Sequence, residues 1–267
     1  MSHTHFSKKK VWITGASSGI GEALVFELAK QGAQIVLSAR NESALQAIAQ
    51  KTNLSPENYL IIPFDLADTS KADEYVQQII QKFGRIDVLI NNGGMSQRGE
   101  AVATTNSTER NLFEINYFAQ VALAKAVLPV MIKQQSGQIT VISSIAGKFG
   151  FYLRSTYSAA KHALHGYFES LRLEVEKNNI QVLLVCPGKI KTNISNNAVL
   201  VDGSKHAKMD ESHINAMTAN ECARQIITAI EKNKHEIFVG GKEIFTIYIK
   251  RFFPKLFYKI IKKQSPY

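Results

Sequence analysis

Short apolar runs alternate along the chain with longer segments in which apolar residues recur every three or four positions. Several of the short runs are almost continuous Val, Ile and Leu, which is typical of parallel strands buried on both faces. The pattern predicts strands at residues 10–14, 34–39, 59–64, 87–90, 138–143, 181–186 and 236–240. It predicts helices between them, among them residues 21–32, 71–84 and 157–177. This alternation predicts one α/β domain, a Rossmann-like, doubly wound parallel sheet of about seven strands with helices on both faces.

Two segments depart from the alternation. Residues 189–217 are polar and weakly periodic, and an irregular segment of that length inside a compact fold is usually functional. We expect it to be the substrate loop of a catalytic domain that spans residues 1–241. Residues 242–267 form a basic, aromatic-rich tail with apolar positions at helical spacing, in which Pro254 either breaks one long helix or starts a second. This amphipathic pattern is typical of a helix on a membrane surface; packing of its apolar face on the body, over the substrate pocket or between subunits, fits equally well.

Positive charge is concentrated in that tail. It holds seven Lys or Arg and one Glu, a balance of +6, against +10 for the whole chain. A nucleic-acid binder needs its basic residues on the folded body, so we expect no nucleic-acid partner. The 45% hydrophobic and 20% charged residues indicate a globular protein. No apolar run approaches the roughly 18 residues that span a bilayer, and none precedes the first strand, so neither a transmembrane helix nor a signal peptide is expected.

Cysteine and histidine usage indicates a reducing compartment and no metal. The two cysteines, Cys186 and Cys222, match no metal-ligand spacing. His162 and His165 lie three residues apart on one predicted helix without a partner cluster. We therefore expect a cytoplasmic protein, peripheral to a membrane if the tail binds lipid, with no disulfide and no metal site.

A glycine-rich turn follows the first predicted strand and precedes a helix. Its sequence, TGASSGIG at residues 14–21, allows backbone N–H groups to approach a pyrophosphate at the amino end of the helix. In dinucleotide-binding folds an acid at the end of the second strand binds the ribose of NAD, and a nearby arginine accepts the 2′-phosphate of NADP. Here Ser38-Ala39-Arg40 has no acid at that place, and Glu42 lies two residues further on. We expect NADP (NADPH) as the cofactor, bound through Arg40. Ser17 would donate a hydrogen bond to a phosphate of the cofactor.

Two tyrosines precede a lysine by four residues, a spacing that places both side chains on one helical face. They are Tyr157 with Lys161, and Tyr258 with Lys262. A cation beside a phenol lowers the pKa of the phenol, so that it can exchange a proton during interconversion of a carbonyl and an alcohol. The first pair follows an apolar strand that ends in Ser143-Ser144, whereas the second lies beyond the last predicted strand. We interpret Tyr157 as the catalytic tyrosine, with one of the two serines as the residue that binds the substrate oxygen.

These motifs together resemble the short-chain dehydrogenase/reductase family. The resemblance covers roughly residues 8–240. It rests on TGASSGIG at 14–21, NNGG at 91–94, Ser144, Tyr157-x-x-x-Lys161 and Pro187-Gly188 followed by Thr192. The stretch NNGGMSQR at 91–98 is similar to the branch that contains dehydrogenase/reductase member 7 and 11-beta-hydroxysteroid dehydrogenase.

The resemblance implies roles for individual residues. The family spacing selects Ser144 over Ser143, and Lys161 would also bind the nicotinamide ribose. The implied catalytic residues are Ser144, Tyr157, Lys161 and, in a proton relay, Asn116. The implied cofactor-binding residues are Gly15, Ser17, Ser18, Gly19, Ile20, Gly21, Arg40, Asp65, Leu66, Asn91, Gly93, Tyr157, Lys161, Pro187, Gly188, Ile190 and Thr192. For Asn91 a structural role in bracing the sheet stays open, as does a capping role for Asp65.

The resulting expectation is an NADP(H)-dependent oxidoreductase that interconverts a ketone or aldehyde and an alcohol, with reduction of a lipophilic carbonyl compound as the cellular direction. The resemblance also implies a homodimer or homotetramer. The alternative is a catalytically idle dinucleotide-sensing or scaffold protein, which the same fold would support. That alternative predicts the loss of Ser144, Tyr157 or Lys161, and none of them is lost.

Overall fold

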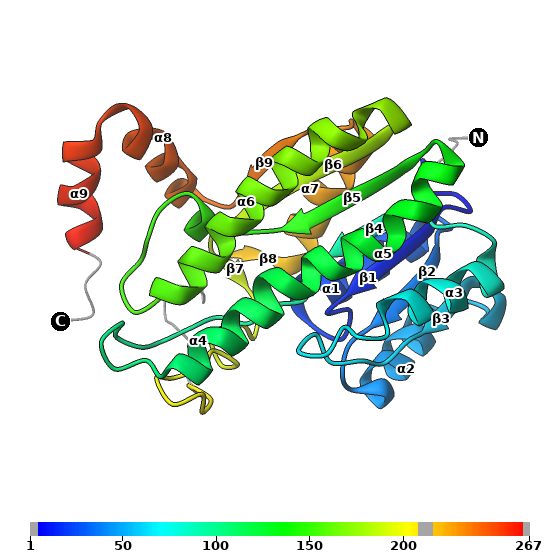
Figure 1. The fold of residues 1–267 in the computed structure, drawn as a ribbon, viewed down its shortest axis with the longest axis horizontal. Coiled ribbons are helices and arrows are strands. Elements are labelled where there is room, and N and C mark those ends of the chain that lie inside the picture. Colours follow the sequence, from blue (N-terminus) through cyan, green and yellow to red (C-terminus); the bar gives the residue numbers. More distant parts are fainter. Residues whose placement is uncertain (1–4, 208–215, 264–267) are drawn as a thin grey trace.

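A parallel sheet of seven strands forms the centre of the molecule (Figure 1). The computed structural model describes residues 5–207 and 216–263. The strands are β1 (Lys10–Thr14), β2 (Gln34–Ser38), β3 (Tyr59–Ile61), β4 (Val88–Asn91), β5 (Gly137–Ile142), β6 (Ile180–Pro187) and β9 (Glu236–Val239). Their order is β3-β2-β1-β4-β5-β6-β9, and every neighbouring pair is parallel. The predicted α/β fold is confirmed, and each predicted strand is present.

Strand β3 ends earlier than the predicted range of 59–64. Ile62 still donates its backbone N–H to Leu37 O at 3.0 Å. Pro63, the next residue, has no N–H to donate, so the regular ladder cannot continue through it. The apolar run is therefore longer than the strand that it contains.

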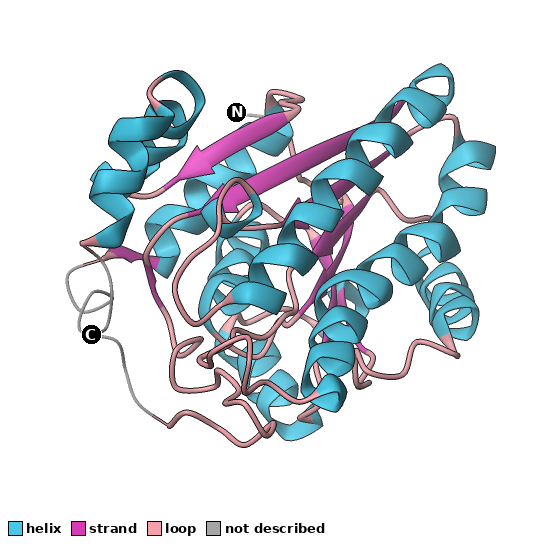
Figure 2. Cartoon of the chain, turned by 60° about the vertical axis from the view of Figure 1, so that its left-hand side comes forward, coloured by secondary structure: helices cyan, strands magenta, loops and turns pink. Residues whose placement is uncertain are grey.

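Helices cover both faces of the sheet, as Figure 2 shows. They are α1 (Gly19–Lys30), α2 (Glu42–Lys51), α3 (Ala72–Phe83), α4 (Asn106–Phe113), α5 (Ala119–Gln134), α6 (Ser155–Val175) and α7 (Ala219–Glu231). Buried side chains of α1, α2 and α7 pack on one face, and those of α3, α5 and α6 pack on the other. Along β1, Val11 and Ile13 belong to the first core and Trp12 to the second, because successive strand residues point to opposite faces.

Helices α4 and α5 form one continuous helical segment, Asn106–Gln134, joined by a π-helical turn at Glu114–Phe118. This segment is long and apolar enough to cross a membrane by length and composition, although the apolar runs in the sequence predicted no transmembrane helix. In the fold it is a core element, because α5 packs against α3 and against strands β4 and β5. Its apolar character therefore serves the core on one face of the sheet.

The expected substrate loop, residues 189–217, is described only in part, since residues 208–215 lie outside the described residues. Two of its pieces, β7 (Ile190–Lys191) and β8 (Met217–Thr218), form a small parallel sheet. Val199 lies in the middle of the described part and pairs with Gln97 and with Lys205. The loop is thereby joined to the segment that follows β4.

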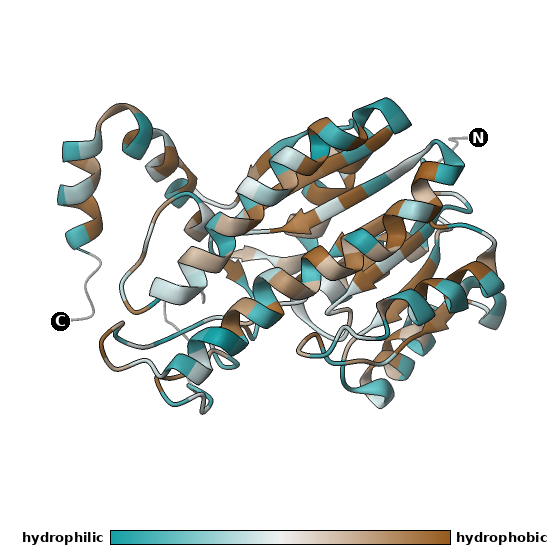
Figure 3. Ribbon diagram, viewed as in Figure 1, coloured by the Kyte–Doolittle hydropathy of each residue, from teal (hydrophilic) through white to brown (hydrophobic). Residues whose placement is uncertain are grey.

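The tail folds as two short helices, α8 (Phe245–Phe252) and α9 (Pro254–Lys262). Pro254 starts α9, where its fixed φ and missing N–H are tolerated. Phe257 and Ile261 are buried in a small cluster with Ile145 and Phe149, which follow strand β5. Both helices project beyond the end of the sheet (Figure 1), and Figure 3 shows that hydrophobic and hydrophilic residues alternate along α9.

Candidate active site

A cavity of about 890 Å³ opens where β1, β4, β5 and β6 end. The strand order reverses between β1 and β4, and doubly wound sheets bind ligands at this crevice. Most of the predicted site residues line the cavity: Gly15, Ser17, Ser18, Gly19, Ile20, Arg40, Asp65, Leu66, Gly93, Asn116, Ser144, Tyr157, Lys161, Pro187, Gly188, Ile190 and Thr192. Gly21 and Asn91 are not among the lining residues. Two predicted cofactor residues therefore lie behind the cavity wall.

The glycine-rich turn is held by the loop after β4. Asn92 donates its side-chain N–H groups to Thr14 O at 2.9 Å and to Gly15 O at 3.2 Å. Gly15 has a φ of +63°, and a Cβ there would lie 2.8 Å from Gly93 Cα, so this close approach requires glycine. A Cβ on Gly21 would collide with the Gly15 carbonyl, so Gly21 lets α1 pack under the turn.

Asn91 braces the sheet from the second core. It is fully buried, and its Nδ2 donates to Gln120 O on α5 at 2.8 Å. The structural role that the sequence left open for Asn91 is thus supported by a specific hydrogen bond. Asn91 is not among the residues that line the cavity.

The far end of the cavity is lined by Ser38, Arg40, Asn41 and Asp65. Arg40 is largely exposed, and its Nη1 lies 3.9 Å from Asp65 Oδ2, which is a weak, solvent-screened pairing. Ser38 is buried and accepts a hydrogen bond from Trp12 Nε1 at 2.9 Å. The side chain that extends into solvent at the end of β2 is thus cationic.

This cavity fits a dinucleotide. The glycine-rich turn and the amino end of α1 supply backbone N–H groups at its middle, and Ser18, the residue before α1, makes no side-chain cap that would occupy them. Arg40 and Asp65 lie at one end and Ser144, Tyr157 and Lys161 at the other. A nicotinamide dinucleotide bound along this cavity would place its phosphates against the turn and its nicotinamide beside Tyr157.

The two adjacent serines after β5 point to different surroundings. Ser144 Oγ accepts the N–H of Ala146 at 3.1 Å and lies 3.4 Å from Pro187 O, and its hydroxyl also forms a hydrogen bond with the Tyr157 phenol. Ser143 is buried, and its Oγ lies 3.3 Å from Lys161 O and 3.1 Å from His165 Nε2. The hydroxyl beside the reactive phenol is therefore that of Ser144.

Tyr157 and Lys161 lie in the first turns of α6 and are both buried. Burial raises the pKa of the Tyr157 phenol, and the hydrogen bond with Ser144 opposes this rise. Burial also lowers the pKa of Lys161 to about 8, so the ammonium remains charged at neutral pH. Lys161 Nζ donates to Ile142 O at 2.8 Å and lies 5.9 Å from the centre of the Tyr157 ring. By contrast, Tyr258 is 57% exposed on α9 and does not line the cavity.

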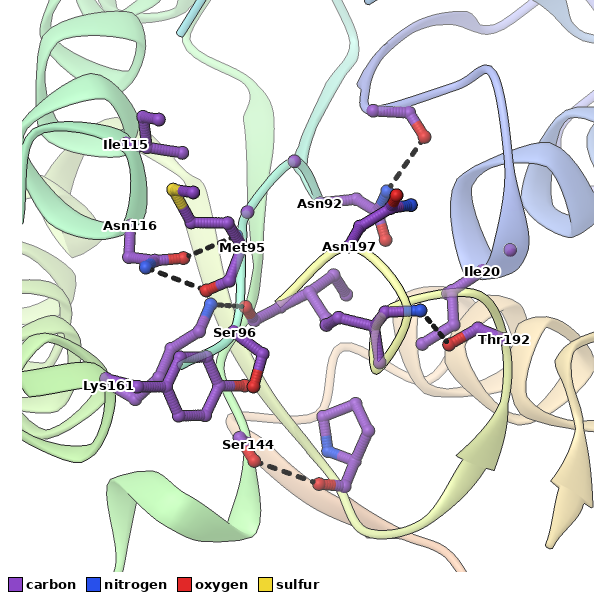
Figure 4. Close-up of a pocket in the computed structure, with 18 of the residues that line it drawn as sticks. Ile20, Asn92, Met95, Ser96, Ile115, Asn116, Ser144, Lys161, Thr192 and Asn197 are labelled. Carbon is purple, nitrogen blue, oxygen red and sulfur yellow. Dashed lines mark hydrogen bonds between the residues drawn. The ribbon is translucent and has the colours of Figure 1, made fainter. Parts of the chain in front are cut away.

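Asn116 is placed by the π-helical turn. It is fully buried, and its side chain makes two hydrogen bonds with the backbone of Met95, accepting from N and donating to O, both at 3.0 Å (Figure 4). A Cβ on Gly94 would lie 2.8 Å from Asn116 Oδ1 and 3.7 Å from Lys161 Nζ. Asn116 therefore lies next to the lysine across the loop that follows β4.

Gln97 is a residue that sequence reasoning missed. It is fully buried, and its Oε1 accepts the backbone N–H groups of Thr156 at 3.0 Å and of Tyr157 at 3.1 Å. The residue before α6, Arg154, makes no side-chain cap, so Gln97 satisfies the helix amino end instead. Its partner residues lie 59 and 60 positions later in the chain, and no local capping pattern reveals such a contact.

A buried polar cluster lies behind Ser143. His165, Cys186 and Glu236 bring possible metal-ligating atoms within 4.8 Å of one another, although the sequence showed no partner cluster for His165. Lys148 Nζ lies 2.6 Å from Glu236 Oε1, so the carboxylate already has a cation. Burial, with Lys148 as the next cause, lowers the pKa of His165 to about 3, and burial raises the pKa of the Cys186 thiol. The Glu236 carboxylate is thus paired with Lys148 and the Cys186 thiol stays protonated, so His165 is the one group of the three in a form that could bind a metal.

Comparison with known proteins gives one family for the whole chain. A family model described as short chain dehydrogenase matches residues 9–201. The chain is 39% identical to dehydrogenase/reductase SDR family member 7B of Bos taurus over 264 residues, which cover 96% of this chain and 81% of the relative. It is 36% identical to dehydrogenase/reductase SDR family member 7 of Homo sapiens over 261 residues, which cover 96% of this chain and 77% of the relative.

Solved structures show the same fold. A short-chain dehydrogenase from Streptomyces avermitilis superposes with a TM-score of 0.80 at 27% identity and covers 97% of this chain and 100% of that chain. A short-chain dehydrogenase/reductase from Burkholderia phymatum in complex with NAD has a TM-score of 0.83 at 20% identity and covers 96% of each chain. At 20% identity, the similarity to the second structure supports the fold alone.

Replacing Gln97 should affect the position of Tyr157 more than the cofactor end of the cavity. In Gln97→Leu the two N–H groups at the start of α6 lose their acceptor, and we expect kcat for oxidoreduction to fall about 10-fold or more, because small displacements of a reacting group are costly. The KM for the nicotinamide dinucleotide should change little. Steady-state kinetics with both substrates varied measure this split.

Gln97→Glu serves as the matched variant, since its carboxylate can accept the same two N–H groups. It should retain most of the wild-type kcat. A Gln97→Leu protein that is folded by thermal melting and has the wild-type kcat would show that Gln97 does not position Tyr157.

Proposed function

The chain belongs to the short-chain dehydrogenase/reductase family, and on that premise we propose that it is an NADP(H)-dependent oxidoreductase that reduces a lipophilic ketone or aldehyde to the alcohol. As a member of this family it acts on CH–OH groups with NAD or NADP as the acceptor. The observation that carries the proposal is the meeting of Ser144, Tyr157 and Lys161 in one cavity that also contains the glycine-rich turn. A protein that only senses the dinucleotide would have no need of this combination.

The proton chemistry follows from the positions of these side chains. The bound nicotinamide supplies the hydride when a carbonyl is reduced. Ser144 donates a hydrogen bond to the substrate oxygen and holds it beside the phenol, and Tyr157 gives that oxygen its proton. Lys161 stabilises the phenolate that remains by its positive charge, and Asn116, close to Lys161 Nζ, orients the path by which the phenol is reprotonated.

The pKa of Tyr157 fits its role as proton donor. Because burial raises this pKa above its ordinary value near 10, the phenol is protonated at neutral pH and is ready to donate. Reduction as the cellular direction follows from NADPH as the proposed hydride donor.

The substrate end of the cavity supports a lipophilic substrate. Ile115, Ile145, Phe149, Phe151 and Ile261 line it, and the last of these belongs to tail helix α9. Such a wall favours apolar ligands by removing their surface from water.

The outer face of the tail supports contact with an anionic membrane. Phe252 and Phe253 are 68% and 64% exposed, and Arg251, Lys255 and Lys259 lie exposed around them. Two copies of the chain that met through this face would bring like charges together, so charge complementarity favours anionic headgroups over a second copy. We place the protein in the cytoplasm, at the surface of a membrane.

For the expected homodimer or homotetramer, exposed Leu173 on α6 offers apolar contact area away from the tail.

The catalytic assignment predicts a large effect at one tyrosine and none at the other. Tyr157→Phe removes the proton donor without changing the volume of the side chain, and we expect kcat to fall about 100-fold or more. Tyr258→Phe makes the same change in the other Tyr-x-x-x-Lys pair and should leave kcat unchanged. NADPH oxidation against a panel of ketones and aldehydes measures both. A Tyr157→Phe enzyme with full activity would refute the mechanism.

The cofactor assignment predicts a loss of preference for NADPH when Arg40 loses its charge. A phosphate–arginine contact is worth roughly 1.5–3 kcal/mol, so Arg40→Gln should raise the KM for NADPH about 10-fold or more and leave the KM for NADH nearly unchanged. Arg224→Gln, at an exposed position on α7, is the matched control. Equal KM values for NADPH in the Arg40 and Arg224 variants would mean that Arg40 does not bind the 2′-phosphate.

The membrane assignment predicts that aromatic residues of the tail anchor the protein. In a Phe252→Ser/Phe253→Ser variant we expect the partition onto vesicles of phosphatidylcholine and phosphatidylserine to fall about 100-fold, since each buried phenylalanine contributes about 1.5–3 kcal/mol. Val102→Ser, at an exposed apolar position outside the tail, should sediment with vesicles like the wild type. Unchanged sedimentation of the double variant, or equal binding to vesicles without phosphatidylserine, would exclude this mode of attachment.

A further inference from the structure

The carboxylate of Glu243 lies at the point where the tail leaves the sheet. Strands β6 and β9 end side by side, since Pro187 pairs with Val239 and Gly188 donates its N–H to Val239 O at 2.7 Å. Glu243 follows shortly after β9, in a 3₁₀ turn at Lys242–Ile244, and it lines the cavity. The first turn of the tail therefore lies beside the chain that leaves β6.

A hydrogen bond joins Glu243 to the segment that follows β6. Its Oε1 accepts the N–H of Lys189 at 2.8 Å and the N–H of Gly241 at 3.1 Å. Lys189 lies 54 positions earlier in the chain, so no local sequence pattern reveals the first of these bonds. One carboxylate oxygen thus holds the start of the tail and the chain beyond β6 together.

Glycines leave the space that this carboxylate occupies. A Cβ on Gly188 would collide with Glu243 Oε1, and a Cβ on Gly240 would lie 2.6 Å from the same atom. The missing side chain at Gly188 therefore allows Glu243 to reach the backbone of Lys189.

The backbone and the charge of Glu243 favour this contact. Its carbonyl oxygen accepts the hydroxyl of Thr246 at 2.5 Å, and Ile244 donates its N–H to Gly241 O at 3.3 Å. Burial raises the pKa of the Glu243 carboxyl, but hydrogen bonds from backbone N–H groups, that of Lys189 first, outweigh burial and hold this pKa below its ordinary value. The side chain is therefore a carboxylate at neutral pH, and hydrogen bonds to a charged acceptor are stronger than those to a neutral one.

The segment that Glu243 holds contains several residues that are expected to bind the cofactor. Those that line the cavity are Pro187, Gly188, Ile190 and Thr192. At one end of the segment, Ser144 Oγ donates to Pro187 O at 3.4 Å. Near the other end, a Cβ on Gly19 would lie 3.1 Å from Thr192 Cγ2, so the segment also contacts the amino end of α1. A displacement of Lys189 would move the chain between the catalytic serine and the glycine-rich turn.

We propose that Glu243 is a positioning residue that fixes residues 187–192 for binding of the nicotinamide dinucleotide. This inference deepens the proposed function and rests on its dinucleotide site. Glu243 acts through the N–H of Lys189 and needs no contact with the cofactor. The first turn of the tail, which the sequence assigned to a region separate from residues 1–241, then belongs to the cofactor site.

The dissociation constant of the dinucleotide measures this role without turnover. NADPH and NADH are titrated by calorimetry into the full-length protein. In Glu243→Ala we expect the Kd of the dinucleotide that binds more tightly to rise about 10-fold or more, as for the loss of one hydrogen bond to a charged group. Removal of a negative charge would by itself strengthen the binding of an anionic ligand, so a purely electrostatic effect has the opposite sign.

Two further variants separate the reach of the side chain from its charge. Glu243→Gln keeps the length and an oxygen that can accept both N–H groups, and its Kd should equal that of the wild type or be lower. Glu243→Asp keeps the charge but is one methylene shorter, so its Kd should rise toward that of the alanine variant. The aspartate variant also replaces the alanine variant if that protein does not fold.

Two controls lie outside this contact. Glu174→Ala, at an exposed position on α6, removes one negative charge elsewhere. Lys250→Met removes the hydrogen bond of α8 to Lys148 O at 2.6 Å and so loosens a different attachment of the tail. Both should bind the dinucleotide like the wild type.

Hydrogen exchange tests the contact in the absence of any cofactor. The amide of Lys189 should exchange about 10-fold or more faster in Glu243→Ala than in the wild type, because it loses its acceptor, and Glu243→Gln should restore its protection. Mass spectrometry of peptides that cover residues 188–192 measures this difference.

Four outcomes overturn the proposal: a wild-type Kd in both Glu243→Ala and Glu243→Asp, a Glu243→Gln protein that binds as weakly as the alanine variant, equal weakening by Lys250→Met, or unchanged exchange of the Lys189 amide in Glu243→Ala. Failure of the proposed function looks different. In that case NADH would bind more tightly than NADPH, or NADPH would not be oxidised with any ketone or aldehyde, while the dependence of dinucleotide binding on Glu243 persisted.

Discussion

The two hydrogen bonds between Gln97 and the amino end of α6 join the loop after β4 to the helix that carries Tyr157, and the position of Tyr157 in the cavity depends on them. The same loop makes the other contacts that define the cavity. Asn92 holds the glycine-rich turn, and Met95 holds Asn116. Residues 91–99 therefore connect the glycine-rich turn, the π-helical turn and helix α6 through hydrogen bonds. Each of these elements belongs to a different part of the chain, and the loop fixes their distances from one another.

Burial is the main cause of the pKa shifts of Tyr157 and Lys161. A phenol in water has a pKa near 10 and an ammonium one near 10.4. Inside this cavity burial raises the pKa of Tyr157 and lowers that of Lys161, because charged forms lose solvation. The two pKa values move in opposite directions. At neutral pH a protonated phenol and an ammonium whose pKa is about 8 therefore lie on one face of α6. Lys161 Nζ is partly compensated by its bond to Ile142 O, which also orients it.

The sequence predicted the parts of this structure that depend on periodicity and local chemistry. Continuous apolar runs gave all seven strands of the sheet, and Pro63 explains the one that ends early. The glycine-rich turn and the Tyr157–Lys161 pair were identified because their residues are close in the chain, and the structure brings them into one cavity. The contacts of Gln97 and the meeting of His165 with Cys186 and Glu236 were missed. Their partners lie far apart in sequence, and a buried glutamine or histidine has no pattern that distinguishes it from an exposed one.

The tail packs on the body beside the cavity. Ile261 lies both in the cluster that anchors α9 to the body and in the wall of the cavity, so the position of α9 sets the shape of the substrate end. Lys250 strengthens this attachment by donating to Lys148 O at 2.6 Å, and Lys148 in turn pairs with Glu236 on β9. The opposite side of the same helices exposes Phe252 and Phe253 among basic residues. On the proposed function, a lipophilic substrate concentrated at a membrane surface would enter a cavity whose wall includes Ile261 of the same tail. Packing against the body therefore accounts for Phe257 and Ile261 but not for all apolar residues of the tail, since Phe252 and Phe253 remain exposed.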